Sequence, residues 1–235
     1  MTRAVQTKGG MLAQSIHRIR RYAGFAASTV SRQGLVESLA DLASELAFDL
    51  RHRSTTVWPG DLDRMEISGG NRTEAVQYQG VSPRLVKALF HRLPREAFDA
   101  PFIDLGAGKG RGLILAAGAG FPRRIGVEFA APLAALCRRN LEQAGVLADV
   151  VEQDAADFPL PAGRLVVFLY NPFHGATLTR VVERLRGHAG RHPVWVLYVN
   201  PQGLETFTRA GFEVIHRLCR RGNLAAVLLR VPGPG

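Results

Sequence analysis

The chain has 235 residues, 46% of them hydrophobic, and a formal net charge of +10. A chain of this length and composition can bury one sizeable core, which excludes a disordered protein and favours one domain with an appendage. No apolar stretch reaches the roughly 18 residues of a membrane span, and no convincing signal-type core follows the basic amino terminus, so we expect a soluble, cytoplasmic protein.

The positive charge is concentrated near the amino terminus. Six basic residues precede the first acid, Glu37, which leaves residues 37–235 with a net charge of only +4. Scattered, solvated charge therefore explains the body of the chain better than a basic surface for nucleic acid, which stays possible but is not favoured. The histidines and the two cysteines, Cys137 and Cys219, lack the spacing of metal ligands or of a disulfide framework, so we predict no metal site.

Residues 1–80 are predicted to form a helical and loop extension. Residues 1–33 contain a basic amphipathic stretch that can cap a substrate channel, touch an acidic partner or merely pack; its acid-free, arginine-rich start also resembles a mitochondrial presequence. Leucines at 35, 39, 42 and 46 predict an amphipathic helix. Residues 51–80, around Trp58, lose this periodicity and predict a long loop, typical of a lid or a substrate-binding segment.

Residues 81–235 are predicted to form the main domain. Ser82 and Pro83 indicate a helix start and Pro94 a helix stop. From residue 100, strand-like and helix-like segments alternate, which is typical of a parallel α/β sheet. Strands are expected at 101–105, 124–128, 148–152, 164–170, 193–199, 212–219 and 224–230, and helices at 109–118, 131–144, 176–187 and 202–209. Only four residues separate the last two strands, so these should form an antiparallel hairpin.

The ends of the predicted strands carry the residues of chemical interest. The first strand ends in Asp104 and continues through alternating glycines from Gly106 to Gly112, which let a ligand approach the backbone closely. Arg111 stands where a dinucleotide motif requires its third glycine, which disfavours a nicotinamide cofactor. Glu128, Asp154 and the stretch 171–173 follow the next three strands, and the carboxyl ends of parallel strands are where ligands bind.

This arrangement resembles the class I, seven-stranded methyltransferases that use S-adenosylmethionine, over about residues 78–230. The resemblance implies a Rossmann-like mixed sheet with helices on both faces and a terminal antiparallel hairpin, and it implies S-adenosylmethionine as cofactor. By the same resemblance, Glu128 binds both ribose hydroxyls, because a carboxylate accepts two hydrogen bonds from a vicinal diol. The other implied cofactor contacts are Asp104, Gly106, Ala107, Gly108 and Gly110 at the methionine end, Asp154 and Ala155 at the adenine, Asn171, and Tyr78 in a segment folding over the cofactor.

Tyr170, Asn171, Pro172 and Phe173 occupy the place of the family's catalytic motif. The side-chain carbonyl of Asn171 and the backbone carbonyl of Pro172 can accept N–H bonds from an amine and aim its lone pair. Tyr170 and Phe173 can add aromatic faces to a cationic group, and ordinary core packing is the alternative for Phe173. His174 can act as a base or simply face solvent.

The resemblance implies methyl transfer, and an amine nitrogen of a protein, peptide or small molecule is the favoured acceptor. The cofactor half is also similar to the non-SET histone-lysine enzymes and the small seven-stranded lysine methyltransferases. Nitrogen methyltransferases commonly have two prolines in the catalytic motif, whereas this chain has one. Three alternatives stay open: an oxygen-directed small-molecule enzyme that needs His174 or another base, an RNA methyltransferase, and a non-catalytic cofactor-binding module. The sequence leaves the acceptor and the oligomeric state undetermined.

Overall fold

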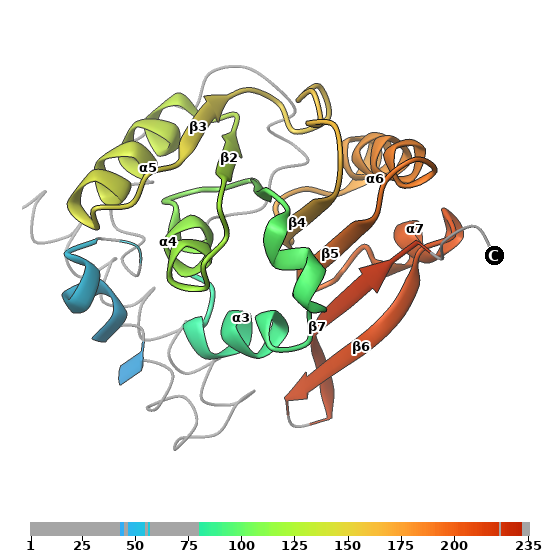
Figure 1. Cartoon of the computed structure of the whole chain (residues 1–235), viewed down its shortest axis with the longest axis horizontal. Helices are drawn as coiled ribbons and strands as arrows, with labels where there is room; N and C mark the ends of the chain where they lie inside the picture. The colour runs from blue at the N-terminus through green and yellow to red at the C-terminus, as the bar shows by residue number, and fades with distance from the viewer. Residues whose placement is uncertain (1–42, 45–46, 55, 57–79, 221, 232–235) are drawn as a thin grey trace, which may run out of the picture. The chain divides into compact units, whose positions relative to one another are not determined.

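The computed structural model describes residues 43–44, 47–54, 56, 80–220 and 222–231. The chain divides into two compact units, Met1–Ala43 and Ser44–Gly235, and every described residue except Ala43 belongs to the second (Figure 1). The basic stretch over 1–33, Trp58 and Tyr78 lie outside the described residues. Residues 47–52 are helical, so the prediction that the loop begins at residue 51 was wrong for Arg51 and His52.

Seven strands form one mixed sheet, as the sequence predicts. They are β1 (Phe102–Leu105), β2 (Arg124–Glu128), β3 (Asp149–Glu152), β4 (Leu165–Tyr170), β5 (Val194–Val199), β6 (Glu213–Arg220) and β7 (Asn223–Arg230). Their order is β3-β2-β1-β4-β5-β7-β6. β7 is antiparallel to β5 and to β6, and the other neighbours are parallel. The chain order therefore reverses between β1 and β4.

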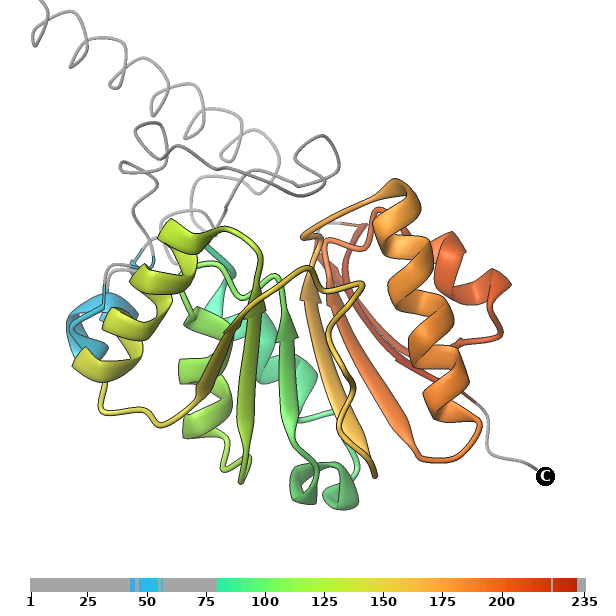
Figure 2. The ribbon, with the colours of Figure 1, turned by 90° about the horizontal axis from the view of Figure 1, so that it is seen from above.

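Helices cover both faces of the sheet, which confirms the expected layering (Figure 2). The helices in the Rossmann-like part are α3 (Pro83–Phe90), α4 (Arg111–Gly118), α5 (Ala131–Gln143), α6 (Gly175–Ala189) and α7 (Leu204–Arg209). Residues of α3, α4 and α5 share one hydrophobic cluster with Phe102 and Phe168 of the sheet. Residues of α6 and α7 share the other cluster with Ile103 and Val167, the neighbours that point to the opposite face.

Several helix boundaries differ from the prediction, and α5 and α6 differ by only one or two residues at an end. α4 begins at Arg111 rather than 109 because Gly110 has a left-handed φ of +87° and lies outside the helix. α3 ends at Phe90, before Pro94, and a short 3-10 helix η2 (Arg95–Asp99) follows that the sequence pattern does not indicate. Residues 202–203 belong to a turn ahead of α7. In each case the middle of the helix was predicted correctly, because it depends on apolar spacing rather than on local turns.

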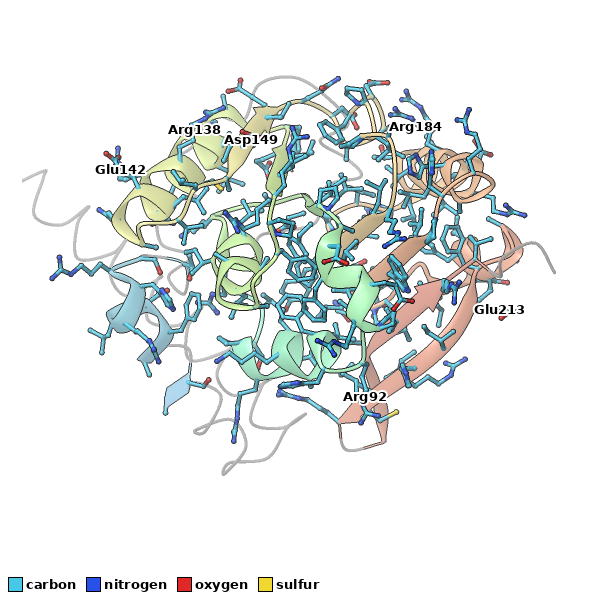
Figure 3. The ribbon with its side chains drawn as sticks, in the orientation of Figure 1. Arg92, Arg138, Glu142, Asp149, Arg184 and Glu213 are labelled. Atoms are coloured by element: carbon cyan, nitrogen blue, oxygen red, sulfur yellow. The ribbon has the colours of Figure 1, made fainter. Side chains whose placement is uncertain are left out.

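The burial of each strand follows its place in the sheet. β4 and β5 are central and are buried along nearly their whole length, which fits their continuous apolar sequences. β6 is an edge strand whose side chains alternate between exposed and half-buried. The charged side chains labelled in Figure 3 lie at the periphery, and two of them, Arg138 and Arg184, donate hydrogen bonds to backbone carbonyls of neighbouring segments. The charged side chains that are buried among the described residues are Asp104, Lys109, Arg111 and Glu128.

The terminal hairpin is confirmed, with a tighter turn than the predicted four-residue connection. Arg220 of β6 pairs with Asn223 of β7, so two residues connect the strands. Gly222 has a φ of +78°, a conformation that two-residue hairpin turns require. Because β7 is antiparallel to both β5 and β6, β6 runs parallel to β5. The carboxyl ends of β5 and β6 therefore point in the same direction.

Candidate functional site

The carboxyl ends of β1, β2 and β4 meet where the strand order reverses, which is the usual ligand site of an open α/β sheet. Three predicted residues come from these ends: Asp104 from β1, Glu128 from β2 and Asn171 from the residue after β4. The segment from Gly106 to Gly110, which we call the glycine loop, contacts all three ends. Residues far apart in sequence therefore form one site.

The glycine loop is held between β2 and the end of β4. The amides of Gly106 and Ala107 both donate to the carbonyl of Val127, at 2.8 and 3.0 Å. Gly106 has a φ of +84°, and a Cβ at this position would lie 2.3 Å from Cβ of Pro172. Only glycine combines this conformation with such a close approach. The loop after β1 and the predicted catalytic motif after β4 are therefore in direct contact.

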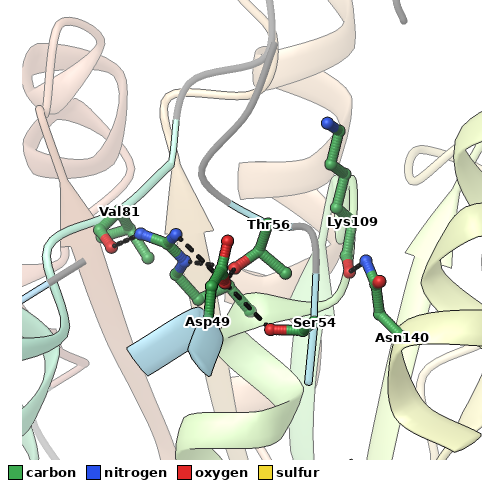
Figure 4. A network of polar contacts seen from close by, with 7 residues as sticks. Asp49, Ser54, Thr56, Val81, Lys109 and Asn140 are labelled. Atoms are coloured by element: carbon green, nitrogen blue, oxygen red, sulfur yellow. Dashed lines mark hydrogen bonds and ion pairs between the residues drawn. The ribbon is translucent and has the colours of Figure 1, made fainter. Parts of the chain in front are cut away.

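The far side of the glycine loop packs on α5. A Cβ at Gly110 would lie 2.7 Å from Sγ of Cys137. Nδ2 of Asn140, one turn further along α5, donates to the carbonyl of Lys109 at 2.9 Å (Figure 4). Cys137 is buried, and this burial raises the pKa of its thiol, which fits a packing residue; Cys219 is exposed.

Glu128 is buried at the end of β2 and is 4% exposed. Its Oε2 accepts a hydrogen bond from the amide of Gly108 at 2.9 Å, and its Oε1 accepts one from the amide of Ala130 at 3.0 Å. Burial raises the pKa of this carboxyl, and the backbone N–H bonds oppose that shift. Each carboxylate oxygen has a second lone pair. Glu128 is thus fixed by the backbone, and the lone pairs that these bonds leave free can accept hydrogen bonds from a ligand.

Asp104 lies beside Glu128 and is 3% exposed. A Cβ at Gly112 would lie 2.3 Å from its Oδ2, so the carboxyl rests on the first turn of α4. Burial, and then the neighbouring Glu128, raise the pKa of Asp104 to about 8. Two neighbouring buried acids, whose ionisation burial disfavours, suit a ligand with positive charge and no phosphate. This donor set fits the ammonium, sulfonium and ribose groups of S-adenosylmethionine.

Asp154 and Ala155 lie in the loop after β3, where both are half-buried. Oδ1 of Asp154 accepts a hydrogen bond from the amide of Ala156 at 2.8 Å, which folds the loop on itself. Two arginines of α6 hold the same loop: Arg180 pairs with Asp157 at 2.5 Å, and Arg184 bonds to the carbonyl of Ala156. The described contacts join Asp154 to its own loop, and its contact with adenine stays a prediction.

Asn171 follows β4 in a left-handed conformation, with a φ of +40°. It is buried, and its Oδ1 accepts a hydrogen bond from the hydroxyl of Tyr198 at 3.4 Å. Tyr170 and Phe173 pack into the hydrophobic clusters on opposite faces of the sheet. For Phe173, which is 7% exposed, this is the core-packing role that the sequence leaves open as the alternative. Contacts of the two rings with a ligand stay predictions.

His174 is exposed and is the residue before α6, where its side chain makes no capping hydrogen bond. It follows the predicted catalytic motif without a contact that would orient it toward Asn171 in the described residues. Within the same part of the chain, no group of three or more His, Cys, Asp or Glu side chains could hold a metal ion. None of the described helices is long and apolar enough to cross a membrane.

Sequence reasoning missed the role of Arg111, which it used only as evidence against a dinucleotide motif. This side chain is 2% exposed and joins α4 to the segment before the sheet (Figure 4). Its Nε donates to Oγ1 of Thr56 at 2.8 Å, and its Nη1 donates to the carbonyl of Val81 at 2.9 Å. Its Nη2 lies 3.7 Å from Oδ1 of Asp49. Arginine as the first residue of an otherwise apolar helix was the available signal.

Asp49 is the second centre of this contact network. Its Oδ1 also accepts hydrogen bonds from the hydroxyls of Ser54 and Thr56, at 2.9 and 2.5 Å. The guanidinium of Arg111 lies 5.3 Å from the ring centre of Phe48. Because Arg111 follows the glycine loop directly, the network attaches residues 48–56 to the wall of the candidate site.

Comparison with known proteins gives information on the fold. No protein-family model matches the chain, and no curated protein is significantly similar to it in sequence. Among solved structures, a putative methyltransferase from Escherichia coli, yhhF, is 23% identical over 72% of this chain and 99% of its own, with a TM-score of 0.51. The glycopeptide N-methyltransferase MtfA, complexed with S-adenosylmethionine, is 15% identical over 65% of this chain and 87% of its own, with a TM-score of 0.50.

A third similar structure is that of an enzyme named for a different reaction. The [4+2]-cyclase SpnF is 13% identical over 72% of this chain and 86% of its own, with a TM-score of 0.52. Together with the strand order, these likenesses show that the chain has the Rossmann-like fold of class I S-adenosylmethionine-dependent methyltransferases. At these identities the likeness establishes the fold alone, so the reaction has to be argued from the site.

Proposed function

We propose that this chain is an S-adenosylmethionine-dependent methyltransferase that acts on an amine nitrogen of a protein, a peptide or a small molecule. The observation that carries the proposal is the buried pair of Asp104 and Glu128 beside a glycine loop that touches Pro172. The pair fits a cationic cofactor, and the contact of the glycine loop with Pro172 would bring the cofactor and acceptor sides together. The fold shared with an N-methyltransferase that binds the same cofactor supports the proposal.

The residues that would hold the cofactor come from three strand ends. Glu128 would accept hydrogen bonds from the ribose hydroxyls, and Asp104 with the glycine loop would face the methionine end. Asp154 and Ala155 would meet the adenine in the loop that Arg180 and Arg184 of α6 hold. When bound, S-adenosylmethionine supplies an electrophilic methyl group on a positively charged sulfur.

The part of the chain after β4 would position the acceptor. A nitrogen lone pair has to lie about 3 Å from the methyl carbon and in line with the leaving sulfur, so positioning accounts for most of the catalysis. Asn171 is buried in a left-handed conformation, and the ring of Pro172 lies against the glycine loop. The side-chain carbonyl of Asn171 and the backbone carbonyl of Pro172 would accept N–H bonds from the amine and orient its lone pair. Since a free lysine has a pKa of about 10.4, the amine has to lose a proton before it reacts.

The extension over residues 1–80 would close over this site, with residues 81–235 as the catalytic domain. The contacts of Asp49 and Thr56 with Arg111 support this part of the proposal, because they lie directly beside the glycine loop. Deletion of residues 1–33 should reduce methyl transfer to at least one substrate. Full activity of the shortened chain on every substrate would contradict a lid function.

Transfer of labelled methyl groups into separate protein, RNA and small-molecule fractions of a lysate tests the reaction. We expect label in the protein or small-molecule fraction, at amine nitrogens, and a strongly reduced but measurable rate of labelling with Asn171→Ala while cofactor binding persists. Label in RNA, or at oxygen with dependence on His174, would contradict the proposed acceptor. Cofactor binding without transfer to any fraction would indicate a non-catalytic binding module.

A further inference from the structure

Beyond the predicted motif, one buried tyrosine contacts Asn171 directly. We propose that Tyr198 is a positioning residue, which fixes the side chain of Asn171 for methyl transfer by a hydrogen bond from the next strand. The inference rests on the proposed function, because it assigns to Tyr198 an effect on the reaction through Asn171. Sequence reasoning gave Tyr198 no role, since it lies inside the apolar sequence of β5.

The position of Tyr198 follows from the pairing of β4 and β5. Tyr198 is the neighbour of Leu169 in the parallel register, so its side chain stands close to the end of β4. It is 0% exposed, and its ring packs on Phe207 of α7, with 5.5 Å between the ring centres. The hydroxyl lies 3.4 Å from Oδ1 of Asn171. A rigid ring in the core thus carries one polar atom to the candidate catalytic side chain.

A second contact determines the direction of this hydrogen bond. The amide of Gly203 donates to the hydroxyl of Tyr198 at 3.1 Å, and a backbone N–H can only donate. The hydroxyl proton is therefore left for Asn171, so an acceptor atom, Oδ1, faces the tyrosine. Burial raises the pKa of Tyr198, which keeps the hydroxyl protonated. Oδ1 retains one lone pair for the N–H group of an acceptor.

The turn after β5 is built to make this arrangement. Asn200 has a left-handed φ of +48°, much like Asn171 at the end of the neighbouring strand, and a proline follows each of them. A Cβ at Gly203 would lie 2.1 Å from Cδ2 of Leu178 and 3.2 Å from the tyrosine hydroxyl, so glycine lets the N–H approach the hydroxyl without displacing either side chain. The hydroxyl of Tyr198 therefore joins two strained turns, and strained asparagines are typical of functional sites.

A purely structural role and a positioning role of Tyr198 predict different results in stability and activity measurements. A buried hydroxyl with two partners stabilises the fold wherever it occurs, and its loss would lower stability without changing the reaction. A positioning role predicts a lower kcat with unchanged cofactor affinity, together with dependence on Asn171. The variants Tyr198→Phe and Phe207→Leu separate these roles, because the first removes only the hydroxyl, and the second disturbs the core around the ring and leaves the hydroxyl in place.

The test combines kinetics with a double-mutant cycle. Using the lysate fraction that accepts label, we expect Tyr198→Phe to lower the methyl-transfer rate roughly fivefold, the effect of one hydrogen bond. Calorimetry with S-adenosylmethionine should give the wild-type affinity. Phe207→Leu should lower the melting temperature and leave the rate unchanged. In an Asn171→Ala background, Tyr198→Phe should have no further effect on the rate. An equal effect in both backgrounds would overturn the inference.

A second readout is independent of the acceptor. The side-chain amide signals of Asn171 in a nitrogen-15 spectrum, assigned by their absence in Asn171→Ala, should shift in Tyr198→Phe and stay in place in Phe207→Leu. Unchanged signals in Tyr198→Phe would overturn the inference, whatever the kinetics give. If no fraction accepts methyl groups, the proposed reaction fails by itself, and the amide signals still decide whether Tyr198 orients Asn171.

Discussion

Asp104 combines deep burial with a neighbouring acid, and this has a consequence for stability. Its pKa rises to about 8 in the folded chain, so the folded state holds a proton that the unfolded chain has lost. The stability that this proton contributes is complete below about pH 4 and is lost as the pH rises through 8. Urea unfolding of the ligand-free protein at pH 5, 7 and 9 should therefore show falling stability, and Asp104→Asn should reduce the slope.

In the Asp104→Asn variant the unfolding free energy should still fall somewhat as the pH rises, because burial also raises the pKa of Glu128. The matched variant is Glu152→Gln, at the exposed end of β3 in register with Glu128, and its slope should equal that of the wild type. Parallel stability curves for the wild type and Asp104→Asn would show that burial does not raise the pKa of Asp104.

Gly106 makes a prediction about packing at the same site. Gly106→Ala places a methyl group against Pro172 in a left-handed conformation, which should cost about 1–3 kcal/mol of unfolding free energy and displace the loop after β4. Gly118→Ala is the control, since a Cβ there meets no atom within 4 Å and the residue is helical. Thermal unfolding compares the two, and equal stability would show that the loops are not in contact.

The anchoring of residues 48–56 on α4 depends on one buried arginine. Arg111→Met keeps much of the side-chain length but removes the hydrogen bonds to Thr56 and Val81 and the contact with the half-buried Asp49, which should cost about 1–3 kcal/mol of unfolding free energy. Amide hydrogen exchange should therefore become faster at residues 47–54. The control is Arg123→Met, which breaks the exposed pair with Asp149 and should change the unfolding free energy by at most about 1 kcal/mol.

Unchanged exchange in Arg111→Met would show that the anchor lies elsewhere. If Arg111 does hold this segment, the Arg111→Met variant also tests whether residues 1–80 influence the cofactor site. Calorimetry would then measure the affinity of this variant for S-adenosylmethionine.

Sequence pattern predicted the elements of this fold well, for reasons visible in the structure. β4 and β5 are apolar throughout because they are central, and the glycine turn after β1 is required by a close approach to Pro172. The helix boundaries were less accurate, since they depend on local turns such as the one at Gly110. The partners of distant contacts could not be identified from the sequence: Arg111 meets Thr56 across 55 positions, and Tyr198 meets Asn171 across 27.

The whole molecule has a fold that it shares with N-methyltransferase and cyclase structures alike, so the fold limits the reaction without determining it. What distinguishes the candidate site is the set of strand-end residues: two buried acids, a glycine loop in contact with Pro172, and an asparagine fixed from the next strand. The cofactor claim rests on the acids and the acceptor claim on the asparagine. The two claims can therefore fail separately.

The most direct measurement is calorimetry of S-adenosylmethionine binding to the wild type, Glu128→Gln and Glu152→Gln. We expect binding to the wild type, a loss of at least about tenfold in affinity when the buried carboxylate is replaced, and wild-type affinity when the exposed one is replaced. Absence of binding by the wild type at millimolar cofactor would contradict the proposed cofactor site, as would equal affinities of the two variants.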